Sequence, residues 1–93
     1  MTQVWKYDVD SDAVLSVPKG AEILCAKVQN GKICVWFEVD PDEKVMEDRV
    51  IVTFGTGWNI PKVDKTYIDT VMINDALVFH VYEVFNVTLE KEE

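Results

Sequence analysis

The chain alternates apolar and polar residues with a period of two, between turn residues, along most of its 93 positions. Such alternation is typical of strands that bury one face and leave the other face in contact with water. No segment holds a sustained helical period, although Asp42 to Asp48 fits one short helical turn. The pattern predicts an all-β domain, either a small antiparallel sandwich or an open barrel of six or seven strands.

Turn residues divide this pattern into seven expected strands. Pro18 and Gly20 fit a tight turn, and Pro41 ends a strand because proline donates no hydrogen bond to a ladder. We expect a single domain over residues 1–89 and a solvated acidic tail over residues 90–93. The expected strands are Val4 to Val9, Ala13 to Val17, Ile23 to Gln29, Lys32 to Val39, Arg49 to Phe54, Tyr67 to Ile73 and Ala76 to Phe85.

The clearest hairpin turns at Asn30-Gly31, which favours a two-residue type I′ turn. This turn places Cys25 opposite Trp36 and Lys27 opposite Cys34. The two sulfur atoms then lie on a diagonal of about 7 to 8 Å, which is too long for an unstrained disulfide. We therefore expect two reduced thiols. The expected core face of this hairpin consists of Leu24, Ala26, Val28, Ile33, Val35 and Phe37.

A second hairpin is expected around Asn74-Asp75. With a two-residue turn, Asp69 faces His80, Tyr67 faces Tyr82, and Val71 faces Val78. Large side chains occupy both faces of this hairpin, and exposed contiguous apolar area usually marks an interface. The chain is therefore expected to form a homo-oligomer. The expected core side consists of Ile68, Thr70, Met72, Leu77, Phe79 and Val81.

Charge and composition exclude several classes of partner. Nine basic residues against seventeen acidic ones give a net charge of −8, which repels duplex nucleic acid and anionic membranes. His80 is the only histidine, which argues against a metal site, and no cofactor is expected. The first residues carry no apolar signal core, and no segment approaches the length of a membrane span. These features predict a cytosolic protein.

The pairing of His80 with Asp69 is the arrangement in this sequence that most suggests chemistry, because a carboxylate can fix the tautomer of an imidazole. A catalytic site would also need a nucleophile, and the sequence places neither Cys34 nor a serine or threonine beside this pair. A structural cross-strand hydrogen bond is the preferred interpretation. We therefore expect a protein that is not an enzyme.

Residues 55–66 break the alternation and form a loop whose length is often functional. The backbone N–H groups of Thr56 and Gly57 could face a phosphate, but the loop lacks the lysine and the helix of a P-loop. Trp58 offers a ring for stacking on a base, and Arg49, the only arginine, can bind a phosphate. The alternative is structural: Trp58 closes the end of the sandwich and Arg49 pairs with an acidic neighbour.

Several strings of this sequence, taken in order, cover nearly the whole chain and resemble a family of short, mostly uncharacterised proteins of tailed bacteriophages and prophages. The chain departs from that family pattern at Val17, Trp58 and Asp69, where Met, His and Gly are usual. The matching strings are Trp5-Lys6-Tyr7, Val17 to Leu24, Val35-Trp36, Val39-Asp40-Pro41, Gly55-Thr56-Gly57, Tyr67 to Val71 and Leu77 to Val81.

The resemblance implies a phage protein in the cytoplasm of an infected bacterium, and it implies no established activity. We expect a counter-defence protein whose paired subunits enclose a nucleotide-like immune signal without cleaving it. The alternatives are an acidic inhibitor that binds a host enzyme and a virion or assembly component. The residues expected to bind the ligand are Arg49, Thr56, Gly57, Trp58, Asn59, His80 and Tyr82.

Overall fold

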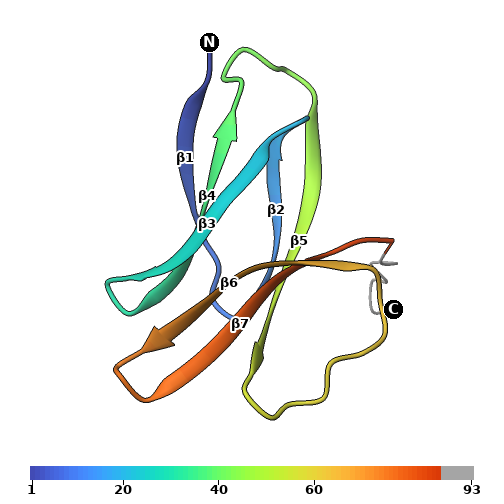
Figure 1. The fold of residues 1–93 in the computed structure, drawn as a ribbon. Coiled ribbons are helices and arrows are strands. Elements are labelled where there is room, and N and C mark those ends of the chain that lie inside the picture. Colours follow the sequence, from blue (N-terminus) through green and yellow to red (C-terminus); the bar gives the residue numbers. More distant parts are fainter. Residues whose placement is uncertain (87–93) are drawn as a thin grey trace, which may run out of the picture.

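The computed structural model describes residues 1–86 as seven antiparallel strands in two sheets (Figure 1). The order is β1-β4-β3 in the three-stranded sheet and β2-β5-β7-β6 in the four-stranded sheet. This open sandwich confirms the predicted fold class, and the expected tail at residues 90–93 lies outside the described residues. The strands are β1 (Gln3–Asp8), β2 (Asp12–Pro18), β3 (Glu22–Gln29), β4 (Lys32–Val39), β5 (Met46–Gly55), β6 (Lys65–Ile73) and β7 (Leu77–Val84).

The core lies between the inner faces of the two sheets. Phe37 of β4 and Ile51 of β5 are its largest fully buried side chains, and Trp5 and Tyr7 of β1 pack against it from one side. The core strands contribute every second residue, as the alternation of the sequence predicts, except at a bulge in β3 and a bulge in β6. The remaining buried members of this cluster are Val9, Leu15, Val17, Ala21, Ala26, Ile33, Val35, Val39, Val71 and Val81.

The first hairpin has the predicted register, with Cys25 opposite Trp36 and Lys27 opposite Cys34. Asn30 and Gly31 both have positive φ, as a type I′ turn requires. Both cysteines are free thiols. One prediction is wrong: a bulge between Ile23 and Cys25 puts Leu24 on the outer face, where it is half exposed. Ile23 packs against the core in its place.

The second hairpin differs from its predicted register because its turn is one residue longer. Asn74 and Asp75 both have positive φ, and Ile73 pairs with Leu77, so that Ala76 also belongs to the turn. A shift of one residue turns a strand over. His80 therefore faces Thr70 instead of Asp69, and Val71 faces Phe79 instead of Val78. The shift turns Thr70 and Met72 of β6 outward and buries Val71, whereas Leu77 keeps the side of Phe79 and Val81 but is exposed next to the turn.

A bulge in β6 restores the predicted pairing further along the hairpin. The register shifts between Tyr67 and Asp69, so Tyr67 faces Tyr82 as the sequence predicts. The short helical turn expected over residues 42–48 is absent, because β5 begins at Met46 and pairs there with Pro18 of β2. Within residues 1–86, no helix has the length and apolar character to cross a membrane.

Asp69 joins the two sheets where the edge of β6 lies beside the edge of β3. Its Oδ2 accepts hydrogen bonds from the backbone N–H of Ala26 at 3.3 Å and from the Lys27 Nζ at 3.1 Å. Burial of the carboxylate raises the pKa of Asp69, but the bonds from Lys27, Thr70 and Ala26 outweigh burial and bring the pKa below its ordinary value of 3.8. Asp69 therefore satisfies an edge donor of β3 that has no partner strand.

We predict that Asp69→Ala destabilises the fold by about 1 to 3 kcal/mol, because the Ala26 N–H loses its charged acceptor. A carboxyl group whose pKa is lowered by folding adds stability above its unfolded pKa, and that stability is lost as the pH falls through the folded value. The difference in unfolding free energy from wild type should therefore be full near pH 7 and should shrink below pH 3.8. Urea unfolding at several pH values measures it, and a pH-independent difference would contradict the assignment.

Candidate functional site

The outer face of the four-stranded sheet carries most of the exposed rings of that sheet. Cross-strand pairing places Val52 of β5 beside Tyr82 of β7, and Tyr82 beside Tyr67 of β6. No strand covers this face in the described part of the chain. We call it the ring face and define it by Val14, Val50, Val52, Phe54, Tyr67, His80 and Tyr82.

Three rings form a continuous row across the ring face. Tyr82 lies in the middle, edge to face with Phe54 at 5.8 Å on one side and with Tyr67 at 5.6 Å on the other, between ring centroids. Phe54 is nearly buried by its neighbours, whereas Tyr67 is 53% exposed and Val14, on edge strand β2, is 49% exposed. The row presents a rigid apolar surface at low cost in side-chain entropy.

A line of hydrogen bonds runs beside these rings and fixes the imidazole of His80. Its Nε2 bonds the Thr56 hydroxyl at 2.8 Å, and its Nδ1 bonds the Thr70 hydroxyl at 3.0 Å. The Thr70 oxygen also bonds the Tyr67 hydroxyl at 2.5 Å. His80 is thus held between hydroxyl groups, with no carboxylate to act as the third member of a catalytic triad.

The loop after β5 turns away from the ring face. Gly55 occupies an inner position opposite Phe79, and the Trp58 ring lies against both residues, 6.1 Å from Phe79 between centroids. A Cβ on Gly55 would come within 2.6 Å of the Trp58 ring. Trp58 thus covers one end of the sandwich, as the structural alternative states, while remaining 60% exposed. Gly57, at φ +90°, and Asn59 lie in the same exposed loop.

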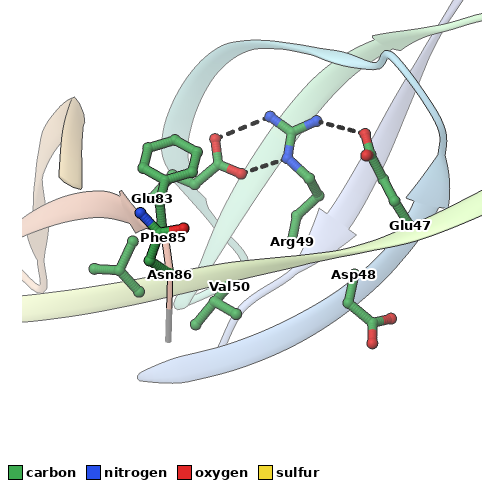
Figure 2. Close-up of a pocket in the computed structure, with 8 residues that line it drawn as sticks. Glu47, Asp48, Arg49, Val50, Glu83, Phe85 and Asn86 are labelled. Atoms are coloured by element: carbon green, nitrogen blue, oxygen red, sulfur yellow. Dashed lines mark hydrogen bonds and ion pairs between the residues drawn. The ribbon is translucent and has the colours of Figure 1, made fainter. Parts of the chain in front are cut away.

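Arg49 lies at the far end of β5 and points between the sheets (Figure 2). Its Nε and Nη2 donate to the two carboxylate oxygens of Glu83, and its Nη1 donates to the Ala21 carbonyl at 2.7 Å. The Glu47 Oε2 lies 3.5 Å from the Arg49 Nη1, and the guanidinium stacks over the Phe37 ring. The hydrogen bond to Glu83 outweighs burial and raises the pKa of Arg49. Arg49 therefore pairs with acidic neighbours, as the structural alternative predicts.

The seven predicted ligand residues occupy three separate places within one subunit. Thr56, His80 and Tyr82 lie together at the ring face. Trp58 lies on the opposite side of the sheet, and Arg49 is on the inner face at the other end of β5. The open depression beside Arg49 has a volume of about 480 Å³ and is also lined by the carboxylates of Glu47, Asp48 and Glu83. Its surroundings are acidic, which disfavours a phosphate there.

Cys34 has none of the properties of a nucleophile. Its side chain is buried, and its Sγ lies 3.3 Å from the Asp8 Oδ1. Burial first, and then Asp8, raise the pKa of the Cys34 thiol, so that the protonated form is favoured. Among residues 1–86, no three histidine, cysteine, aspartate or glutamate side chains are grouped so that they could hold a metal ion.

Of the ring face, the predicted ligand set includes only His80 and Tyr82; it omits Phe54, and it also omits Thr70, whose hydroxyl bonds His80. Thr70 was assigned to the core side, because the turn at Asn74 is one residue longer than expected. Phe54 was treated as an ordinary strand residue, although its alternation with Ile51 and Thr53 already places it on the outer face. The alternation of β5 was sufficient to find Phe54, whereas only the turn length could have found Thr70.

Comparison with protein families gives one match, which spans residues 1–90 and is described as a domain of unknown function (DUF7352). The chain belongs to this family. No curated protein and no solved structure matches it. The DUF7352 description names neither a function nor a source, so the resemblance to phage proteins stays a prediction.

We predict that Arg49→Ala destabilises this DUF7352 domain by about 3 to 5 kcal/mol, because it leaves the Glu83 carboxylate buried without a partner. Replacing both charges, as in Arg49→Met with Glu83→Leu, should recover most of the loss. Urea unfolding of the three proteins provides the measurement. An Arg49→Ala protein as stable as wild type would show that Arg49 is free for a ligand.

We also predict that Gly55→Ala displaces the Trp58 ring, since the new methyl group would occupy its position. Overpacking of this kind costs about 1 to 3 kcal/mol, and urea unfolding of the variant measures the loss. The control is Gly55→Ala in a Trp58→Ala background, where the methyl group meets no ring and the stability should change little. Equal destabilisation in both backgrounds would contradict this packing.

Proposed function

We propose that this DUF7352 domain is a non-catalytic binding protein that covers a basic site on another protein with its ring face. The observation that carries the proposal is the row of Phe54, Tyr82 and Tyr67 on a sheet face that no described strand covers. Exposed contiguous apolar surface on a small domain marks an interaction site. Tyrosine also provides large contact area with little loss of conformational freedom.

Charge favours a basic partner. The chain carries a net charge of −8, and pairing with β5 places Asp12 and Asp48 on the outer side of the sheet, next to the ring face. Lys65, opposite Val84, is a cation on the same side. An acidic surface accelerates association with a basic partner and disfavours acidic competitors. In the infected bacterium that the resemblance implies, such a protein would inhibit a host defence factor.

Capture of a nucleotide-like signal is the second candidate function. The specific observation in its favour is the line of Thr56, His80, Thr70 and Tyr67, which offers hydrogen-bonding groups next to rings that could stack on a base. Its weakness is the phosphate, because Arg49 is paired with Glu83 and does not face this line. The cation for the phosphate would then have to be Lys65, on the same side of the sheet, or a residue of another subunit.

The first test measures capture of a host protein by two ring face variants and a matched control. Tyr67→Ser and Val14→Lys change exposed side chains at two edges of the ring face, and Val45→Ser changes an exposed side chain away from it. We expect capture from host lysate to fall at least tenfold for the first two variants and to stay unchanged for Val45→Ser. Capture that is equal in all proteins, or that survives 1 M salt, would contradict the proposal.

Calorimetric titration with a panel of cyclic and linear nucleotides separates the two candidate functions. The protein-binding proposal predicts no heat at micromolar ligand. Heat that disappears in Tyr67→Ser would instead support nucleotide capture at the ring face and would overturn the first candidate.

A further inference from the structure

The outer face of the three-stranded sheet carries a second apolar patch, independent of the ring face. Val4 of β1 is 56% exposed and Leu24 of β3 is 48% exposed, and they lie on either side of Trp36 of the central strand β4. With Cys25 and the stem of Lys27, they line a shallow depression of about 290 Å³. We call this surface, together with the charged residues that share it, the Trp36 face.

Charges on the Trp36 face are unevenly distributed along the strands, with its two glutamates at one end and Lys32 and Asp8 toward the other. At one end, Glu22 of β3 stands directly opposite Glu38 of β4. Like charges in this position destabilise a sheet, and no lysine or arginine within residues 1–86 forms an ion pair with either carboxylate. At the other end, Lys32 stands opposite Gln29, and the Lys6 Nζ reaches the Gln29 Oε1 at 2.6 Å.

The outward-pointing residues of the Trp36 face sum to no net charge, although the chain is strongly acidic and Lys27 also pairs with Asp69 of the other sheet. Three lysines and three acidic residues point outward from the Trp36 face: Lys6, Lys27, Lys32, Asp8, Glu22 and Glu38. The net charge of −8 is therefore carried by the rest of the sequence. Two copies of this chain repel each other through their net charge, and a face without net charge adds little to that repulsion.

We propose that the Trp36 face binds a second copy of the same chain through a two-fold axis that lies in the interface, perpendicular to the strands. Such an axis reverses the strand direction and places β1 over β1 and β4 over β4. With the axis crossing β4 at Val35, Glu38 meets Lys32 of the partner subunit. In the same arrangement Lys6 meets Asp8 of the partner subunit, and Trp36 lies close to the axis.

Charge complementarity selects this orientation and this partner. A two-fold axis parallel to the strands would place Glu38 over its own copy and would bring like charges together. The perpendicular axis gives each carboxylate of β1 and β4 on this face an opposite charge, and it buries tryptophan at the centre, where interfaces concentrate their binding energy. The ring faces of the pair then point outward in opposite directions, which would allow bivalent capture.

Sedimentation equilibrium of the full chain between about 1 and 500 μM tests the proposal, with the single variants Glu38→Lys and Lys32→Glu and their double variant. Each single reversal appears twice in a two-fold dimer, so its dissociation constant should rise about tenfold. The double variant exchanges the two charges and should restore the wild-type constant. Circular dichroism melts verify that all four proteins are folded.

Two further readouts decide the outcome. Tyr67→Ser on the ring face should leave the dimer unchanged, and Trp36→Ser should weaken it at least tenfold. A wild-type chain that stays monomeric at 500 μM would overturn the proposal. A dimer that ignores both single reversals, or a double variant as weak as the single variants, would do so as well, because the assigned contacts would then be wrong.

Discussion

The Arg49 side chain, through its ion pair with Glu83 and its contacts to Ala21 and Phe37, connects the two sheets of this fold. Both charged groups lie on inner faces, where an unpaired charge would be strongly unfavourable. From β5, the guanidinium reaches Glu83 on β7, the carbonyl of Ala21 before β3, and the ring of Phe37 on β4. The Arg49 side chain therefore joins both sheets at an open end of the sandwich. It donates hydrogen bonds there to the Glu83 carboxylate and the Ala21 carbonyl, for which the apolar core offers no donor.

This pairing determines what the rest of the surface can bind. The only guanidinium of the chain lies between the sheets, where it is bonded to Glu83. The groups that the outer faces present to a partner are therefore rings, hydroxyl groups, lysines and carboxylates. The ring face has rings and few cations, which suits a protein surface better than a phosphate. The Trp36 face has charges of both signs around a tryptophan, which suits a copy of itself. In our two proposals, the outer faces therefore bind different partners.

The alternation of the sequence was sufficient to predict the sandwich, the first hairpin and most of the inner residues, because one period governs both burial and pairing. The prediction failed where a local irregularity shifted the alternation of inward and outward residues by one position. The bulge at Leu24 and the extra turn residue Ala76 follow no pattern of period two. The candidate site was predicted less well. Arg49 and Trp58 lie far from His80, and their positions depend on how the two sheets pack, which the alternation does not specify.

The length of one turn also decides what chemistry His80 can support. A two-residue turn at Asn74 would place Asp69 beside the imidazole, where a carboxylate could orient it as a base. The observed turn includes Ala76, so Thr70 takes that place and Asp69 is free to bond Ala26 and Lys27 across the gap between the sheets. One extra residue thus uses the carboxylate for sheet packing and leaves the imidazole among hydroxyl groups. Both ring nitrogens of His80 are then engaged by threonine hydroxyl groups, and no carboxylate orients the ring in the described part of the chain.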